Sequence, residues 1–221
     1  MRGVGGAVLL VAFALLAAPL SAAAATLGVD ITGDGVAGVN PVAFTIGWAV
    51  DVTTPVRVTA LGAWDEGSDG LNVSAPVGLW TGTGTLLAST TVPAGSGADI
   101  AVPSVLGAGQ WLFEDIPDVV LPVGHYVLGL VTVADETVFR AFQDGIVLDP
   151  ALANFDSAKF AVGSSLQFPN LDGSPDLDIG LFGPDFLLEP VTAPAPLPAS
   201  LALFGLGLLG FGARWAIRKL G

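Results

Sequence analysis

The chain has 221 residues, of which seven are Lys or Arg and twenty are Asp or Glu, so its formal net charge is −13. It contains no Cys and a single His, which excludes disulfide bonds and deprives a zinc site of its usual ligands. So acidic a chain is repelled by the phosphates of DNA and RNA, which excludes nucleic-acid binding.

Residues 1–25 are predicted to be a secretory signal peptide. Arg2 precedes an apolar run over residues 3–18, and small residues fill positions 21–25. Because signal peptidase requires small side chains just before the bond it cuts, cleavage is expected after Ala23 or Ala25. An uncleaved membrane anchor is the alternative interpretation.

Residues 26–190 are predicted to form one all-β domain, a β-sandwich or jelly roll. Short apolar or alternating runs are separated by Gly, Pro, Asn and Asp, and no helical periodicity is sustained. The expected strands are residues 43–50, 56–64, 77–80, 85–92, 110–116, 124–133, 137–142 and one near 179–187. About 165 residues suffice for one buried core without a second domain.

The core is predicted from alternation and from the aromatic residues. Residues 126–131 are nearly all apolar, which predicts a strand covered on both faces. In the run 56–61, Val56, Val58 and Ala60 share one face, whereas Arg57, Thr59 and Leu61 share the other. The aromatic residues expected in the core are Trp48, Trp64, Trp80, Phe113, Tyr126, Phe139 and Phe142, with Trp111 left open.

The body carries no motif for catalysis, so we expect a non-enzymatic protein. His125 is the only imidazole and lies at the start of a strand, and no G-x-S-x-G sequence is present. A structural role for His125 is therefore favoured. Twenty acids offer many carboxylate pairs, so no particular pair indicates a glycosidase site.

Calcium is the one ligand that the sequence makes a candidate. All twenty acids lie between Asp30 and Glu189, against three bases, a net charge of about −17 over that stretch. The turn with Asp172, Asp176 and Asp178 is the first candidate for weak calcium binding, followed by the acidic turns at residues 30–35 and 65–69. The alternative is that these are ordinary solvated turns, which favour Asp and Gly for conformational reasons.

Residues 191–221 are predicted to be a linker and a membrane helix. Residues 191–198 are rich in Pro, residues 199–213 are apolar, and Arg214, Arg218 and Lys219 follow as a stop-transfer signal. Fifteen helical residues reach only about 22 Å, and extension to Ile217 brings the helix to about 28 Å, just enough to span a bilayer. The basic end would place the carboxyl terminus in the cytoplasm and the acidic body outside.

The tail resembles a known sorting signal. Pro196, Leu197, Pro198, Ala199 and Ser200, followed by a Gly- and Leu-rich helix and a basic end, resemble the PEP-CTERM signal of Gram-negative bacteria, with Leu197 in place of the usual Glu. This resemblance implies processing by exosortase and a place among surface or secreted proteins of bacteria that make exopolysaccharide. The departure at Leu197 leaves the cleavage point open, and an ordinary tail anchor is the alternative.

The body resembles a β-sandwich domain that recurs in PEP-CTERM proteins, and also the uncharacterised DUF4082 module of secreted bacterial proteins. The runs that carry this resemblance include residues 46–48, 55–62, 76–80, 121–129 and 183–186. It implies the fold and export, and it brings no catalytic residues.

The sequence therefore predicts an exported surface or extracellular-matrix protein with a structural or adhesive role linked to exopolysaccharide and biofilm. A carbohydrate- or ice-binding module is the second hypothesis, and a glycan-active hydrolase is the third. The expected partners are signal peptidase, exosortase, the inner membrane before processing, and extracellular polysaccharide. No cofactor is expected beyond weakly bound calcium.

Overall fold

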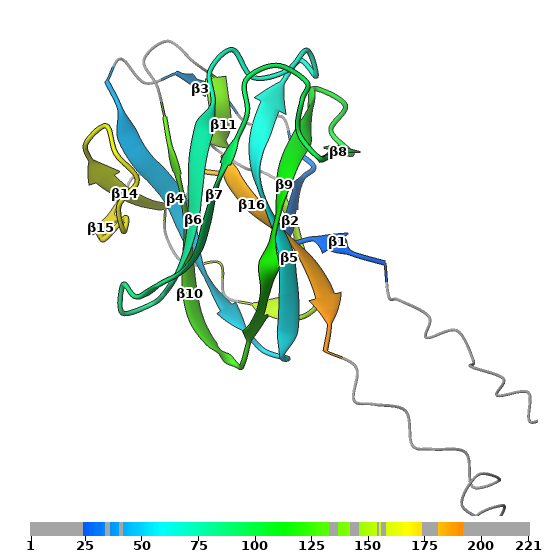
Figure 1. Ribbon diagram of the computed structural model, residues 1–221, viewed down its shortest axis with the longest axis vertical. Helices are drawn as coiled ribbons and strands as arrows, with labels where there is room; N and C mark the ends of the chain where they lie inside the picture. Colours follow the sequence, from blue (N-terminus) through cyan, green and yellow to red (C-terminus); the bar gives the residue numbers. More distant parts are fainter. Residues whose placement is uncertain are drawn as a thin grey trace, which may run out of the picture.

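The body of the chain folds into two facing β-sheets, as the computed structural model in Figure 1 shows. The structure describes residues 24–33, 36–39, 42–132, 137–141, 146–153, 155, 158–173 and 181–191. Residues 1–23 of the predicted signal peptide and the predicted C-terminal helix lie outside these ranges. All regular elements within the described ranges are strands, and these ranges contain no helix able to cross a membrane.

The first sheet has five antiparallel strands in the order β1-β16-β5-β9-β8. Its members are β1 (Thr26–Leu27), β16 (Pro184–Pro190), β5 (Val56–Glu66), β9 (Gly109–Leu121) and β8 (Ile100–Pro103). The first and last strands of the chain are therefore neighbours at one edge of this sheet.

The second sheet has seven strands in the order β15-β14-β4-β10-β6-β7, with β13 also paired to β4. Its members are β4 (Phe44–Val52), β6 (Ala75–Thr81), β7 (Leu86–Val92), β10 (Gly124–Val131), β13 (Leu152–Ala153), β14 (Ala158–Val162) and β15 (Leu171–Asp172). In Figure 1, β14 and β15 lie at the opposite side of the molecule from β1.

Two short ribbons complete the body. One pairs β2 (Val29–Ile31) with β12 (Ile146–Leu148), and the other pairs β3 (Val36–Val39) with β11 (Thr137–Ala141). β11 lies against β5, so β5 is covered by β11 in addition to the second sheet. This additional cover explains why β5 is buried on both faces from Ala60 to Asp65.

The main core lies between the sheets and is organised around Trp48. The indole packs against Phe155, Phe182 and Phe186, with ring centroids 5.7 to 6.4 Å apart. Its Nε1 donates a 2.7 Å hydrogen bond to the carbonyl oxygen of Pro184 on the facing sheet. Trp48 therefore joins the two sheets by apolar contact and by a buried polar bond at once.

A row of glycines crosses the second sheet at one register. Gly129 on β10 pairs with Gly47 on β4 and with Gly78 on β6. The indole of Trp80 lies over this row, because a Cβ added to Gly78 would be 2.4 Å from that ring. Trp80 also contacts Phe168, at 6.2 Å between centroids.

The structure confirms most of the predicted core and refines the rest. Trp48, Trp64, Trp80, Phe113, Tyr126 and the strand over residues 126–131 are buried as expected. Trp80, however, is buried on the outer face of its sheet rather than in the central cluster. Trp111 is fully buried, stacked edge-on against Trp64. The side chains of Phe139 and Phe142 lie outside the described residues.

The predicted strands are present with shifted ends, whereas the short ones were missed. The last strand begins at Pro184, after the predicted start near residue 179, and β9 continues to Leu121 instead of ending at residue 116. The unpredicted strands are β1, β2, β3, β8, β12, β13, β14 and β15, none longer than five residues. So short a run carries too little alternation to be recognised.

Candidate functional site

The two ends of the body lie side by side, and a groove separates them from the neighbouring loops. Thr26 of β1 pairs with Leu188 of β16, and the amide of Gly28 donates a 2.9 Å hydrogen bond to the carbonyl oxygen of Phe186. The predicted leader and the predicted sorting tail are therefore joined to the body at neighbouring positions.

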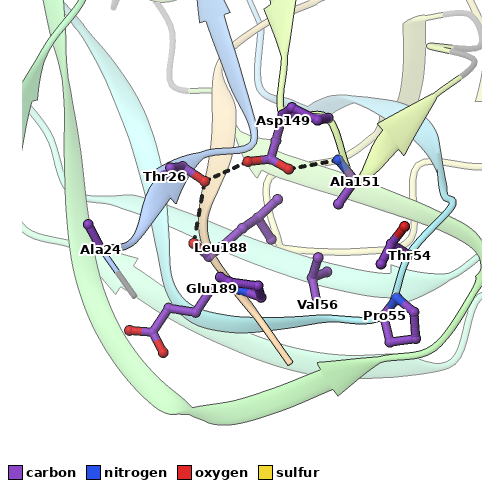
Figure 2. Close-up of a pocket in the computed structure, with 11 residues that line it drawn as sticks. Ala24, Thr26, Thr54, Pro55, Val56, Asp149, Ala151, Leu188 and Glu189 are labelled. Carbon is purple, nitrogen blue, oxygen red and sulfur yellow. Dashed lines mark hydrogen bonds between the residues drawn. The ribbon is translucent and has the colours of Figure 1, made fainter. Parts of the chain in front are cut away.

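We call this hollow the terminal groove; its volume is about 430 Å³ (Figure 2). Its walls come from the start of β1, the turn between β4 and β5, the loop after β12 and the end of β16. The lining residues are Ala24, Thr26, Thr54, Pro55, Val56, Asp149, Pro150, Ala151, Leu188, Glu189 and Pro190. Apart from two threonines and two acids, the lining is apolar.

The polar groups of the terminal groove centre on Asp149. The Thr26 hydroxyl donates to Asp149 Oδ2 at 2.6 Å, and the amide of Ala151 donates to Oδ1 at 2.8 Å (Figure 2). Glu189, also in the lining, is 3.9 Å from Arg57 Nη1. The groove thus combines apolar walls with negative charge at its rim.

A second polar feature is a pair of neighbouring carboxyl groups, those of Asp30 on β2 and Asp185 on β16. Asp30 accepts hydrogen bonds from Ser104 Oγ at 2.7 Å, from Trp111 Nε1 at 3.3 Å and from the amide of Val105 at 3.1 Å. These bonds tie β2 to the end of β8 and to β9. Asp30 is therefore used as an acceptor for the chain's own donors, which argues against the calcium loop considered at residues 30–35; Asp34 lies outside the described residues.

Asp185 is fully buried, and its Oδ2 has no hydrogen-bond partner. Its Oδ1 accepts from the amide of Val29 at 3.1 Å. Burial raises the pKa of Asp185 well above its usual range, and the nearby charge of Asp30 raises the pKa further, against the opposing effect of hydrogen bonds from the backbone of Phe186 and Val29. Burial accordingly favours the neutral carboxylic acid form of Asp185 over its carboxylate.

The structure places only part of the predicted calcium turn. Asp172 lies exposed on β15 and forms an ion pair with Lys159, whereas Asp176 and Asp178 lie outside the described residues. Among the residues that are described, no three His, Cys, Asp or Glu side chains gather as a metal site would require. Weak calcium binding at this turn stays a prediction.

The acidic turn at residues 65–69 differs from a simple solvated turn. Asp65 is buried and accepts from the amide of Gly70 at 3.0 Å and from Gln110 Nε2 at 2.7 Å, whereas Asp69 is exposed. Gly67 and Ser68 between them have positive φ angles of 83° and 59°. The side chain of Asp65 thus closes the tight turn that begins at this residue.

His125 lies on the surface beside Asp51, with its Nδ1 2.9 Å from Asp51 Oδ1 and both side chains about two-fifths exposed. The two residues are also cross-strand partners in β10 and β4. This placement fits the structural role expected for His125, at the entrance of its strand.

The sorting residues Pro196, Leu197, Pro198, Ala199 and Ser200 and the stop-transfer residues Arg214, Arg218 and Lys219 lie outside the described residues. Residues 194–219 match the PEP-CTERM protein-sorting motif. Comparison with curated proteins and with solved structures gave no match. The motif implies an exported protein that exosortase sorts at the membrane. The resemblance of the body to DUF4082 stays a prediction.

Sequence reasoning missed the residues that form the terminal groove. The pairing of β1 with β16 brings Thr26 beside Glu189, and the pairing of β12 with β2, with a 3.0 Å hydrogen bond from the Asp149 amide to the Gly28 carbonyl oxygen, brings Asp149 beside Thr26. No local pattern signals such a contact. Asp185 did carry a signal, because it is an acid within a strand otherwise composed of apolar residues from Pro184 to Leu188.

Proposed function

We propose that this protein is exported, processed by exosortase and placed at the cell surface or in the extracellular matrix, where it has a structural or adhesive role linked to exopolysaccharide and biofilm. The observation that carries the proposal is the position of the sorting motif. The motif begins at residue 194, with only three residues between it and the last strand, so the β-sandwich is cargo directly attached to its sorting signal.

The proposed route has three steps. Signal peptidase removes the leader after Ala23 or Ala25, and the helix over residues 199–221 then holds the body outside the inner membrane. Exosortase recognises the Pro-Leu-Pro run of residues 196–198 and cuts there, separating the body from the basic end that stays on the cytoplasmic side.

We propose that the sandwich acts without catalysis and without a resident cofactor. Its single imidazole lies at the surface in contact with a carboxylate, which suits a strand-pairing contact better than proton transfer to a bound substrate. Its polar interior groups are engaged in holding strands and turns, as the four donors to Asp30 illustrate. Calcium at the turn of Asp172, Asp176 and Asp178 would be an accessory ligand of the surface.

The carbohydrate-binding alternative receives less support. Sugar rings stack on exposed aromatic faces. Within the described body, Trp48, Trp64, Trp80 and Trp111 are at most 4 % exposed. We therefore rank an adhesive role through polar surface contacts above a stacking site.

Mass spectrometry of the protein from cells with and without exosortase tests the sorting step. We expect a carboxyl terminus near residues 196–200 in the first sample and an intact one in the second. The double variant Pro196→Ala/Pro198→Ala should keep its tail in both samples, whereas Thr192→Ala, outside the matched motif, should be processed normally. An intact tail in both samples of the unmodified protein would contradict the proposal.

The extracellular role is tested separately by fractionating a biofilm. Cells that produce the protein should retain it with the exopolysaccharide, and enzymatic digestion of the polysaccharide should release it. A protein recovered entirely from the culture medium, with no loss of biofilm when its gene is deleted, would contradict a structural or adhesive role.

A further inference from the structure

We propose that removal of the signal peptide creates the ligand of the terminal groove: the new α-ammonium group of the mature chain, held at the rim by the carboxylate of Asp149. This inference rests on the export proposed above, because the charged amino group exists at this place only after the leader is cut.

The positions of Ala24 and Thr26 carry the argument. Cleavage after Ala23 makes Ala24 the first residue, and cleavage after Ala25 makes Thr26 the first; both residues line the groove. The Thr26 hydroxyl is 2.6 Å from Asp149 Oδ2. The backbone nitrogen of a threonine lies about 3 Å from its own hydroxyl oxygen, so an ammonium on Thr26 would be within about 6 Å of the carboxylate. Opposite charges at this separation stabilise each other.

The charges around the groove favour Asp149 over Glu189 as the partner. Glu189 on β16 already has Arg57 of β5 nearby, at 3.9 Å. Among the described residues, the hydrogen bonds to Asp149 come from neutral donors, the Thr26 hydroxyl and the Ala151 amide. Figure 2 draws the Glu189 carboxylate on the Ala24 side of the groove, where it adds to the negative potential that an amino terminus meets.

The consequence is a link between leader removal and completion of the fold. β1 is a two-residue strand at the edge of the first sheet, so few bonds hold it. In the precursor the nitrogen of the first mature residue belongs to an uncharged peptide bond. Cleavage replaces that bond by a cation beside Asp149 and thereby ties β1 more firmly to the loop after β12.

The test titrates the terminal amine of the mature protein purified from exporting cells. Mass spectrometry first establishes the amino terminus, and reductive methylation with ¹³C-formaldehyde then labels the terminal amine for NMR while keeping its charge. We expect a pKa for this amine about half a unit to one unit higher than that of the same labelled chain in urea, a three- to tenfold gain in proton affinity. Asp149→Asn should abolish the difference, whereas Asp69→Asn, which changes an exposed acid in the distant turn, should leave it intact.

A second readout separates this contact from the capping of Ala151 by the same side chain. Acetylating the amines removes the charge of the terminus and also that of Lys159, whose ion pair with Asp172 is common to both proteins. The Tm should therefore fall by about 1 to 3 °C more in the unmodified protein than in the Asp149→Asn variant, whatever that variant's own stability.

Identical titrations for the unmodified protein and Asp149→Asn, or equal effects of acetylation on both, would overturn the inference while leaving the export intact. A leader still attached to the purified protein would overturn the export and this inference together.

Discussion

Replacing Asp185 by Asn should change how stability depends on pH, because this carboxyl group is buried with one oxygen that has no partner. In the unfolded chain Asp185 ionises near its usual pKa, about 3.9. In the folded protein burial raises the pKa of Asp185. The folded state therefore binds a proton that the unfolded state has lost, and the stability conferred at low pH decreases as pH rises from the unfolded-state pKa towards the folded-state pKa.

The magnitude follows from proton linkage. In the interval between the two pKa values of Asp185, each pH unit lowers the free energy of unfolding by about 1.4 kcal/mol. Each unit of that interval is thus a sizeable part of the 5 to 15 kcal/mol typical of a domain. Asn has nearly the same shape and cannot ionise. The fixed cost of burying its amide is the same at every pH and cancels from the slope.

The assay is urea unfolding of the mature protein at pH 5, 6, 7 and 8, followed by tryptophan fluorescence. The difference in unfolding free energy between Asp185→Asn and the unmodified protein should grow in favour of the variant as pH rises. Asp69→Asn serves as the control, because its side chain is exposed and its difference should stay nearly constant. A constant difference for Asp185→Asn across the same range would refute the buried, protonated state.

Three further predictions concern the sheets and the linker. Gly47→Ala should lower the free energy of unfolding by more than about 3 kcal/mol, because the added Cβ would lie 1.8 Å from the Leu128 carbonyl oxygen. Denaturant unfolding measures this loss, and Gly97→Ala, whose Cβ meets nothing within 4 Å, is the matched control. Trp48→Phe should cost about 2 to 4 kcal/mol in the same assay, because it leaves the Pro184 carbonyl oxygen unpaired between the sheets. Deleting residues 192–195 should reduce exosortase processing, measured as retained tail by mass spectrometry, whereas replacing them by four serines should not.

The strands that were predicted correctly carry one of two sequence patterns: apolar and polar residues alternate, or all residues are apolar. β10 is an example, since residues 126–131 are apolar and buried together. The alternation in residues 56–61 was correct as far as Thr59 and failed as a guide to burial at Leu61, which is fully buried. The extra cover on the outer face of β5 causes this difference. It comes from β11, which was predicted as a strand but whose place against β5 the sequence did not reveal.

The candidate site was less accessible to sequence reasoning than the fold. Asp172 was selected because acids cluster near it, yet the structure pairs it with Lys159 on the adjacent strand. Asp149 and Thr26 were overlooked because one lies in a loop and the other beside the leader, and only the pairing of β2 with β12 relates them. Contacts between distant parts of a chain depend on register, which local composition does not determine.

The pairing of β1 with β16 also constrains how the proposed precursor stands on the membrane. The chain from Pro190 to Ala199 makes nine residue-to-residue steps and reaches at most about 32 Å when fully extended, so the edge of the sandwich bearing the terminal groove must stay within that distance of the bilayer. The stretch between Asp30 and Glu189 carries a net charge of about −17 by composition, and its repulsion from anionic headgroups acts within a screening length of about 8 Å. The extended tether is about four screening lengths long, so it lets the acidic body stand clear of the surface that repels it. Once exosortase cuts the tether, that repulsion favours departure of the body from the membrane over renewed contact.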